Sequence, residues 1–503
     1  MNRMVIILVM LLILIPIDNN AIDSIVEEKS DVHHGKTLYV GGDGPNNYTK
    51  IQDAIDNASD GDTIVVYPKI YKENLLLQKQ LALIGIDYPV IDAHGKDGIT
   101  IMAENCIVDE FKIMNGSNGT VILSDDNIIS NNIIENNNHS DVRSAGVYIL
   151  NSVRNRIINN TISYNKNGII LHNSSQNIIS YNNISGHIYW HGIWIINSIG
   201  NNISSNSFFN NDFHILGSSS HKNSIYQNFF ISLNGSVLSL HGNINIIYNN
   251  TFKYLTGIWI SGINDEFIYN NASESRIFLK GENATIKNNI LRSIYIEGGN
   301  LSQFLHEISN NTCEGKEIYY IKNMHNIIIP KNVSQVIIVN CSNIIIENLS
   351  FINTAGIEII YSSNVTVANN VIAKNGEGIY MLHSNNVVIT HNKIVENSEG
   401  IRIIFSKGIK IVNNNISSNF RAFFWWGAFF CLVKNNNLID NRYEHEIGNS
   451  FFNFWLHNYW DEWYLPVPKP ILVCIVIPKL FMICPCFPWL NFDWLPALKP
   501  IEV

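Results

Sequence analysis

Short apolar runs alternate along most of the chain with short polar runs of Asn, Ser, His and Gly. Residues 378–381, 386–389 and 392–394 show the pattern, with one to three apolar side chains in each run. Runs of this length fit β-strands and are too short for helices. The pattern therefore predicts short strands that are joined by tight polar corners.

The phrase Asn-x-aliphatic recurs at a period near 22 residues. In one stretch the spacing between successive asparagines is 22 throughout; in another it is 22, 24, 22 and 22. A Gly or Ala precedes many of these asparagines by 14 residues. A fixed period of this kind is typical of a solenoid. The positions are Asn370, Asn392, Asn414 and Asn436; Asn160, Asn182, Asn206, Asn228 and Asn250; and Gly146, Gly168, Gly192, Gly356, Gly378, Gly400 and Ala422.

One repeat holds three strands and has no room for a helix, so it predicts one rung of a parallel β-helix. Each strand would pair with its equivalent about 4.8 Å above and below. A single rung is not stable alone, because ordering its backbone costs roughly 1–2 kcal/mol per residue and each buried Ile or Val returns roughly 1.5–3 kcal/mol. Stacking supplies the missing core and hydrogen bonds. We therefore expect an all-β, single-stranded parallel β-helix.

Composition supports this fold. The chain contains 75 asparagines, and Pro330 is the only proline between Pro89 and Pro466. Proline is excluded from central strands, whereas Asn tolerates left-handed corners and can stack in amide ladders. About twenty asparagines, such as Asn159 and Asn183, begin Asn-x-Ser/Thr sequons. Corner asparagines produce such matches by chance, so glycosylation stays an open alternative.

The N-terminal region departs from the repeat in two places. Arg3 and the apolar residues 4–17 fit a secretory signal, so we expect residues 1–21 to be a signal peptide or, alternatively, an uncleaved anchor. Residues 49–58 predict an amphipathic helix that begins with a capping box at Thr49 and covers the open end of the solenoid. The β-helix with this cap would span residues 37–450.

The C-terminal region is rich in Pro and Trp. The period is lost after Asn449, and eight of the 13 prolines and five of the ten tryptophans lie beyond Phe454. We therefore expect residues 451–503 to form an irregular C-terminal cap. No membrane span is expected apart from the N-terminal anchor alternative.

Charge and cysteine content exclude some functions. The formal net charge is −9 and only 15% of residues are charged, so there is no basic stripe for nucleic acid. Seven scattered cysteines predict no disulfide framework. Met482, Cys484 and Cys486 could offer soft ligands to Cu(I), although hydrophobic packing is the simpler role. We expect no metal site and no cofactor, with calcium and copper as open alternatives.

The opening of the chain carries a family resemblance. Residues 37–40 (Thr-Leu-Tyr-Val), 51–55 (Ile-Gln-Asp-Ala-Ile) and 61–68 (Gly-Asp-Thr-Ile-Val-Val-Tyr-Pro), followed by Asn-rich rungs, resemble the pectin-lyase-like right-handed β-helix proteins. The chain looks most similar to the NosD-type, carbohydrate-binding and sugar-hydrolysis repeat proteins of archaeal cell surfaces. Residues 458–461 and 491–494 resemble the closing segment of such proteins. The resemblance implies a right-handed fold, whereas activity varies widely within this repeat type.

The catalytic residues of enzymes with this fold are not assembled in the sequence. The hydrolases that it resembles need an aspartate cluster with His-Gly and Arg-x-Lys elements, and the chain has Asp125 and Asp126 but no Arg-x-Lys. The lyases need an acidic Ca²⁺ site beside an arginine. No acidic cluster accompanies Arg143 or Arg402 in the repeat.

A file of residues is predicted to point outward along one strand position. If the residue one after each register Gly points inward, the residue two after it faces solvent. Aligned aromatic and apolar residues on a surface suit stacking on sugar rings, and the alternative is that a loop or another subunit covers them. The file reads Tyr148, Ile170, Trp194, Leu216, Leu238 and Trp259, and later Glu358, Tyr380, Arg402 and Phe424.

Two insertions lie at the same corner of the solenoid. The interval from the Asn phrase to the next Gly is 8 residues in most rungs, 14 from Asn132 and 10 from Asn182. The extra residues should bulge out two rungs apart, beside Tyr148 and Trp194. They include His139, Asp141 and Arg143 in one loop and His187, Tyr189, Trp190 and His191 in the other.

We expect an exported protein, extracellular or on the cell surface, that binds a polysaccharide or cell-surface glycan or is structural or adhesive, without catalysis. The carbohydrate-binding candidates are Tyr148, Tyr189, Trp190, Trp194, Trp259, Tyr380 and Arg402. The alternative is a polysaccharide lyase or glycoside hydrolase, and its catalytic candidates are Asp141, Arg143, His187 and His191. A NosD-like copper-maturation factor is a third hypothesis.

Overall fold

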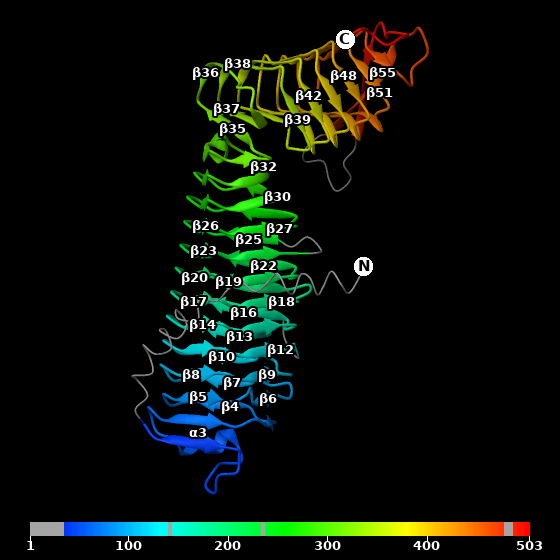
Figure 1. Cartoon of the computed structure of the whole chain (residues 1–503). Helices are drawn as coiled ribbons and strands as arrows, with labels where there is room; N and C mark the ends of the chain where they lie inside the picture. Colours follow the sequence, from blue (N-terminus) through cyan, green and yellow to red (C-terminus); the bar gives the residue numbers. More distant parts are fainter. Residues whose placement is uncertain (1–34, 139–142, 233–236, 477–485) are drawn as a thin grey trace. The chain divides into compact units, whose positions relative to one another are not determined.

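The computed structural model describes residues 35–138, 143–232, 237–476 and 486–503. The chain forms two compact units, residues 1–285 and 286–503. In both units short parallel strands stack in three columns, so that each rung contributes one strand to each column (Figure 1). This confirms the predicted solenoid with three strands per rung.

The three columns of unit 1 follow one another along each rung. The first column contains β1 (Thr37–Val40), β2 (Thr63–Val66), β5 (Ala82–Gly85), β8 (Ile107–Asp109), β11 (Ile128–Ser130), β14 (Arg156–Ile158), β17 (Ile178–Ser180), β20 (Asn202–Ser204), β23 (Ser224–Tyr226), β26 (Ile246–Tyr248) and β29 (Glu266–Ile268). The second contains β3 (Ile70–Tyr71), β6 (Val90–Asp92), β9 (Lys112–Met114), β12 (Ile133–Glu135), β15 (Thr161–Ser163), β18 (Asn183–Ser185), β21 (Ser207–Phe209), β24 (Phe229–Ile231) and β27 (Thr251–Lys253). The third contains β4 (Leu75–Leu77), β7 (Ile99–Ile101), β10 (Thr120–Ile122), β13 (Ala145–Leu150), β16 (Asn167–His172), β19 (His191–Ile196), β22 (Phe213–Ser218), β25 (Val237–His241) and β28 (Gly257–Ile260). The long strand β30 (Asn271–Leu279) then pairs with both β27 and β28.

Unit 2 repeats the same arrangement. Its first column contains β36 (His325–Ile328), β38 (Ser342–Glu347), β41 (Ser363–Ala368), β44 (Val388–Thr390), β47 (Lys410–Val412), β50 (Leu432–Lys434) and β53 (Phe454–Leu456). The second contains β39 (Ser350–Ile352), β42 (Val371–Ala373), β45 (Lys393–Val395), β48 (Asn415–Ser417), β51 (Asn437–Ile439) and β54 (Tyr459–Trp460). The third contains β35 (Lys316–Lys322), β37 (Val333–Val339), β40 (Ile357–Ile360), β43 (Glu377–Leu382), β46 (Glu399–Ile404), β49 (Arg421–Trp426) and β52 (Tyr443–Gly448).

The stretch without a clear period in the sequence is the irregular part of the structure. It contains β31 (Thr285–Lys287), β32 (Ile290–Ile296), the 3₁₀-helix η1 (Leu301–Phe304), β33 (Glu307–Ser309) and β34 (Thr312–Cys313). Here β34 and β35 pair antiparallel, unlike the strands of the columns. The period is lost because one strand of a rung is lengthened or reversed.

Inward-pointing aliphatic side chains form the core of each unit. In the first column, Ile157, Ile179 and Ile203 occupy equivalent positions on successive rungs, and each is fully buried. Their neighbours in sequence point outward because side chains alternate along a strand. Burying an Ile side chain stabilises the fold by roughly 1.5–3 kcal/mol. A stack of identical residues thus adds a similar increment of core with every rung.

A short helix covers the N-terminal rung, as predicted, but its cap differs. The helix α3 (Ile51–Asn57) buries Ile51, Ala54 and Ile55, and the N-cap residue Lys50 makes no side-chain cap bond. The carboxylate of Glu73 accepts instead, from the backbone N–H groups of Ile51 and Gln52 at 3.0 Å each. The predicted capping box at Thr49 is therefore wrong, because a carboxylate from the neighbouring rung meets the free N–H groups at the helix start.

Buried asparagines form ladders at the corners. In the ladder before the second column of unit 1, the Oδ1 of each Asn accepts the backbone N–H of the Asn one rung earlier at 2.9 Å. The same Oδ1 accepts the earlier Nδ2–H at 3.0–3.1 Å. The ladder comprises Asn132, Asn160, Asn182, Asn206, Asn228, Asn250 and Asn270. Similar ladders precede the other columns, so buried backbone groups at the corners are satisfied.

The residues at the left-handed corner angles are not the ladder asparagines. Positive φ belongs to the residue just before each of them, for example Asn159 and Tyr181 before Asn160 and Asn182. The sequence analysis assigned both properties to the same asparagines. In the structure these two properties belong to two neighbouring positions. The first residue has the left-handed angle and is at least partly exposed, and the second is buried and makes the ladder hydrogen bonds.

The C-terminal segment corrects the predicted domain boundary. The ladder of unit 2 continues from Asn436 to Asn458 with an N···Oδ1 distance of 3.0 Å, and β54 completes a further rung. Two antiparallel strands follow, β55 (Lys469–Val476) and β56 (Cys486–Asp493). The prediction ended the repeat near residue 450, because the Pro- and Trp-rich composition hid the spacing of 22 residues between Asn436 and Asn458.

Asp493 ends this ladder. Its Oδ2 accepts from the backbone N–H of Asn458 at 3.1 Å, from its Nδ2 at 2.9 Å and from Nε1 of Trp460 at 3.0 Å. Asp493 and Trp460 are fully buried. The carboxylate of β56 thus takes the place that the next rung's amide would occupy.

Asp265 ends a ladder of unit 1 in a less favourable way. Its Oδ1 accepts from the backbone N–H of Asn245 at 2.7 Å and from its Nδ2 at 3.2 Å. Its Oδ2 is buried and has no hydrogen-bond donor within the described ranges. Burial raises the pKa of Asp265 to about 6. An ionised side chain here is therefore disfavoured relative to the unfolded chain.

Asp265→Asn should stabilise unit 1 at neutral pH. The folded pKa of about 6 lies above the ordinary aspartate pKa of 3.8, so stability should fall as pH rises between these values and level off above them. A shift of this size corresponds to roughly 3 kcal/mol, and we expect the variant to recover about 1–3 kcal/mol at pH 7.5 and little at pH 4. Thermal unfolding midpoints at the two pH values measure this. Glu266→Gln, which changes the partly exposed neighbour, should show no such gain; a variant no more stable than the parent at pH 7.5 would contradict the argument.

Asp493→Ala should loosen the last rungs of unit 2. Three buried donors lose their acceptor, and each unsatisfied group costs roughly 1–3 kcal/mol. We expect a loss of at least about 2 kcal/mol, read as faster amide hydrogen exchange in residues 454–460. Glu502→Ala, which removes an exposed carboxylate, should leave exchange unchanged. Equal protection in Asp493→Ala and the parent would show that the carboxylate does not hold the ladder end.

Candidate functional site

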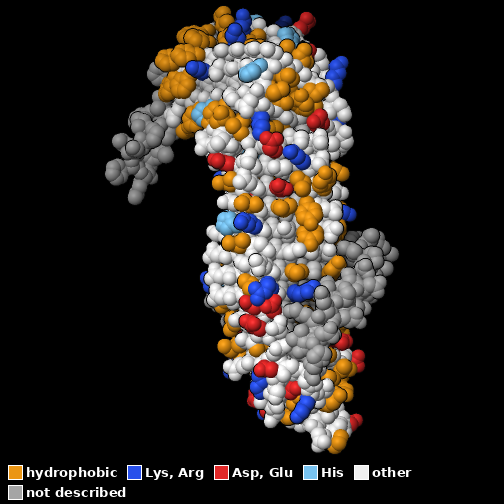
Figure 2. All heavy atoms as spheres, turned by 90° about the vertical axis from the view of Figure 1, so that its left-hand side faces the viewer, with side chains coloured by type: hydrophobic (Ala, Val, Ile, Leu, Met, Phe, Trp, Pro, Cys, Tyr) orange, Lys and Arg blue, Asp and Glu red, His pale blue; other side chains and the backbone are white. Residues whose placement is uncertain are grey.

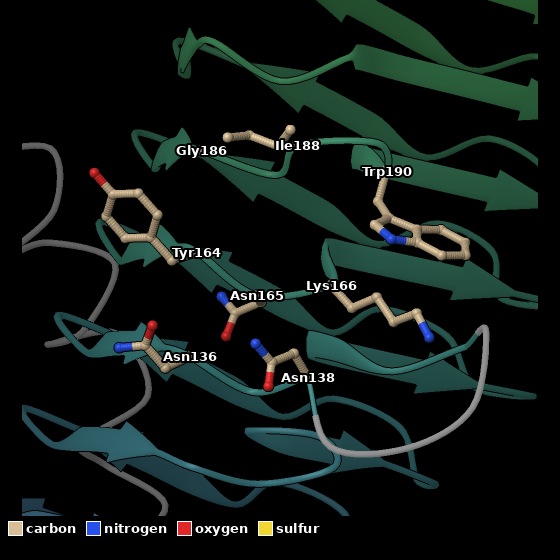
Figure 3. A pocket seen from close by; sticks show the side chains of 8 residues that line it. All are labelled: Asn136, Asn138, Tyr164, Asn165, Lys166, Gly186, Ile188 and Trp190. Carbon is tan, nitrogen blue, oxygen red and sulfur yellow. The ribbon is translucent and has the colours of Figure 1, made fainter.

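The two predicted insertions flank a pocket at one corner of unit 1. The pocket has a volume of about 560 Å³. Its lining comes from three successive rungs, at the turns between the second and third columns (Figure 3). The lining residues are Asn136, Asn138, Tyr164, Asn165, Lys166, Gly186, Ile188 and Trp190. The pocket therefore lies at the corner where the sequence analysis predicted a site.

Two aromatic rings border the pocket. Figure 3 shows Tyr164 and Trp190 on opposite sides, with the amides of Asn138 and Asn165 between them. Tyr164 is 61% exposed and has a φ of 53°, a left-handed angle that costs energy for a bulky residue. The Nζ of Lys166 lies 4.8 Å from the centroid of the Trp190 ring. The pocket therefore combines ring faces, amides and one cation.

Sequence reasoning missed Tyr164 and Lys166. Both lie on the rung between the two insertions, where the period is undisturbed. The signal that could have found Tyr164 is its corner position, which Asn136 and Gly186 occupy on the neighbouring rungs with φ values of 56° and 73°. Tyrosine also occupies this corner at Tyr254, so the signal is an aromatic corner residue on the rung between the two insertions.

The structure corrects the expected position of His187. Its ring is fully buried, with Nδ1 donating to the carbonyl oxygen of Asn165 at 2.9 Å. Its backbone N–H donates to Oδ1 of Asn211 at 3.2 Å, as a ladder asparagine would. Burial lowers the pKa of His187 to about 4, so the ring is neutral at physiological pH. His187 is a member of the ladder and does not face a ligand from the loop.

His191 belongs to a packed aromatic group beside the pocket. Its Nδ1 lies 2.8 Å from Oδ1 of Asn167, and its ring centroid lies 4.9 Å from that of Trp194 and 5.3 Å from that of Phe213. Burial lowers its pKa to about 4. A neutral, stacked imidazole of this kind fixes the position of Trp194.

The remaining loop candidates lie apart from these histidines. Arg143 is exposed, and Tyr189 is 82% exposed with a φ of 68°. His139 and Asp141 lie outside the described residues. Within the described part of the chain, the candidates Arg143, His187 and His191 are therefore not brought together as a catalytic group.

The outward file of unit 1 is largely as expected. Tyr148, Trp194 and Trp259 are partly exposed, and the hydroxyl of Tyr148 lies 3.0 Å from Nδ1 of His172. Ile170 pairs between Tyr148 and Trp194 but is fully buried, because the large neighbours on either side cover it. Leu238 points inward. Ser239 takes the outward place, since the register shifts by one residue between β22 and β25.

In unit 2 the same file carries charges. Arg402 lies between two rings, with its guanidinium carbon 5.4 Å from the centroid of Tyr380 and 5.1 Å from that of Phe424. Its Nη1 lies 2.5 Å from Oε1 of Glu377 and 3.6 Å from Oε2 of Glu399. These contacts hold Tyr380 and Arg402 in place.

Glu358 departs from the prediction that it faces solvent. It is 2% exposed, and its Oε1 accepts from Nε2 of Gln335 at 3.2 Å. Burial and the nearby Glu377 raise its pKa well above the ordinary value. Its buried position therefore disfavours the ionised form of the carboxyl group.

Metal ligands and membrane-spanning helices were also sought in the described ranges. These ranges contain no group of three or more His, Cys, Asp or Glu side chains placed to hold a metal ion. They also contain no helix that is long and apolar enough to span a membrane. Cys106, Cys313, Cys341 and Cys431 are buried free thiols, and Cys474 is disulfide-bonded. Met482 and Cys484 of the copper hypothesis lie outside the described residues.

Comparison with protein families gives two matches along the chain. Residues 55–254 match the family described as periplasmic copper-binding protein (NosD), and residues 275–438 match the right-handed β-helix region family. The chain is also 40% identical over 97 residues to a cell surface glycoprotein of Methanothermus fervidus. That match covers 18% of this chain and 16% of the relative, so the chain spans only a small part of the relative's length.

Solved structures of similar architecture are distant in sequence. One is the DFA-IIIase of Arthrobacter chlorophenolicus A6 without its lid, at 13% identity and a TM-score of 0.40, covering 63% of this chain and 94% of that one. Another is the pectate lyase Pel9A, at 14% identity and a TM-score of 0.32, covering 56% and 80%. Neither supports a statement about function at these values. The two family matches and the three-strand rungs in both units agree on the fold, which is a right-handed parallel β-helix similar to these two families over the matched residues.

Proposed function

We propose that the protein is an exported surface protein that binds carbohydrate in the corner pocket of unit 1. The observation that carries the proposal is the pocket between Tyr164 and Trp190. Aromatic faces pack against the C–H faces of a sugar ring, and amides such as those of Asn136 and Asn138 exchange hydrogen bonds with its hydroxyls. A volume of about 560 Å³ suits a short oligosaccharide segment.

The scaffold favours such a role. Rigid rungs hold the lining residues, and binding residues on proteins concentrate in loops on rigid scaffolds. Lys166 stacks on Trp190 and restricts its ring, so less side-chain entropy is lost when a ligand binds. Tyr164 accepts a left-handed backbone angle to present its ring.

Three observations support a surface location. The N-terminal residues read as an export signal or anchor. Cys474 is disulfide-bonded, and disulfides persist in oxidising compartments outside the cytosol. Part of the chain is similar to a protein described as a cell surface glycoprotein.

Tyr164→Asn should weaken carbohydrate binding while leaving the fold intact. Asn is well suited to the left-handed angle, so the change removes the ring without adding strain. Stacking on an aromatic ring contributes roughly 0.5–1.5 kcal/mol, and we expect about a 3- to 10-fold loss of affinity. A glycan array identifies the ligand, and titration calorimetry with that oligosaccharide measures the change.

Tyr254→Asn is the matched control. Tyr254 occupies the same corner several rungs away, with a φ of 60° and 57% exposure, and does not line the pocket. Its replacement should leave affinity unchanged. Trp190→Ala should reduce binding more strongly than Tyr164→Asn, because the larger ring and its lysine contact are both lost. If the array shows no binding, or if both tyrosine variants weaken binding equally, the pocket is not the binding site.

A further inference from the structure

In the described ranges, the asparagines that begin sequons lie at outward positions. The first and third residues of Asn-x-Ser/Thr point to the same side of a strand, because side chains alternate with a period of two. An inward pair would place two polar groups in the aliphatic core. The ladder asparagines do not begin sequons: Asn160 and Asn182, for instance, are followed two residues later by the inward Ile162 and Ile184.

Burial agrees with this rule. Nineteen of the twenty sequons have their asparagine within the described ranges, and none of these nineteen asparagines is buried. They are Asn47, Asn57, Asn115, Asn118, Asn138, Asn159, Asn173, Asn183, Asn202, Asn249, Asn271, Asn283, Asn300, Asn310, Asn332, Asn340, Asn348, Asn364 and Asn415. A modifying enzyme could therefore reach sequons along the whole solenoid.

Seven of these asparagines are exposed and donate no recorded hydrogen bond from Nδ2, and three of the seven lie on the second column of unit 1, on the strand β30 that pairs with it, or within two residues of one of its strands. Asn183, Asn249 and Asn271 are all exposed, and the described structure records no hydrogen bond from the Nδ2 of any of them. By contrast, the Nδ2 of Asn159 donates to Asn131 at 2.7 Å and that of Asn202 to Tyr226 at 2.9 Å. The three free amides lie at or beside the second column of unit 1.

Asn249 and Asn271 lie on successive rungs. Thr251, the third residue of the first sequon, is the strand partner of Asn271 in the β27–β30 pair. The two acceptor amides therefore share one edge of the solenoid. Asn183 lies on the same column, on β18, where it pairs with Thr161 and Ser207.

We propose that this edge of unit 1 is N-glycosylated, at Asn183, Asn249 and Asn271. In the reaction, Nδ2 of the asparagine forms a bond to the anomeric carbon of a sugar, and the bond from that carbon to a phosphate oxygen of an activated lipid-phosphate donor breaks. The electron pair leaves with the phosphate, and a proton is lost from Nδ2. The product amide keeps one N–H, and no ladder bond is disturbed. The chemical class of the modification is an N-linked oligosaccharide.

The sequons are distributed unevenly along the chain. Nineteen of the twenty precede residue 365, and Asn415 is the exception. The rungs beyond residue 400 instead expose large aromatic side chains, including Phe405, Phe430, Phe452 and Phe454 at 52–65% exposure. Figure 2 shows one face of the protein, on which hydrophobic side chains are scattered among uncharged ones and charged side chains are fewer. Glycans would therefore cover polar rungs and leave the aromatic rungs bare.

Peptide mapping of the protein purified from the cells that make it tests the proposal. Mass spectrometry of proteolytic peptides should find a sugar mass on Asn183, Asn249 and Asn271. Fragmentation should place the second of these on Asn249 and not on its buried ladder neighbour Asn250, which provides an internal control. Unmodified peptides at all three positions would overturn the proposal.

Variants at the third sequon position give a second readout in the same host. Thr251→Ala removes the sequon but leaves Asn249 and Asn250 unchanged, so the sugar mass at this site should disappear. Thr251→Ser keeps the sequon and should keep the mass. Thermal unfolding should be similar in both variants, because Thr251 is outward on its strand. A sugar mass that survives Thr251→Ala, or that lies on Asn250, would show that the modification does not follow the sequon.

Discussion

The structure depends on the hydrogen bond that each buried corner asparagine accepts from the rung before it. A β-helix turns its backbone sharply three times per rung, and each turn leaves buried N–H groups that no strand partner can reach. The stacked amides meet this need at 2.9–3.0 Å, rung after rung, as from Asn160 to Asn182. Because each amide is satisfied only by its neighbours, the unpaired end of a ladder is the weak point of the fold.

The ladder also explains which substitutions the corners accept. His187 replaces an asparagine because its backbone N–H and Nδ1 can make equivalent bonds to Asn211 and Asn165. Asp493 ends a ladder with three donors on Oδ2, whereas Asp265 ends one with two donors on Oδ1; in both residues the second carboxylate oxygen is buried and has no donor within the described ranges. A carboxylate in a ladder is thus favourable only when enough donors surround it.

Much of the fold could be predicted because each residue type that marks the repeat has a single structural role. Asn lies at the corners and Ile lies in the core. The 22-residue spacing of Asn and the inward Ile determined the three columns, and the two insertions located the corner pocket. Side-chain detail was harder to predict. His187 lies in an inserted segment but at a ladder position, which only the register reveals, and a one-residue shift between β22 and β25 exchanged Leu238 for Ser239. Tyr164 gave no signal in a period analysis that attended to Asn and Gly.

The separation of buried from exposed corner residues is what allows this fold to carry function. The ladder position is constrained by its bonds, so changes there affect stability. The residue before it makes few such bonds and is constrained mainly by its left-handed backbone angle. It can therefore be Asn, Tyr, Ser or Gln, as at Asn159, Tyr181, Ser205 and Gln227. A solenoid can therefore vary its outer corners from rung to rung without disturbing its core. Tyr164 and the unbonded amide of Asn249 both lie at left-handed corner positions of this kind, and Asn183 and Asn271 lie on the exposed edge beside them. A pocket and a modified edge can consequently arise on one column of rungs by changing exposed residues alone.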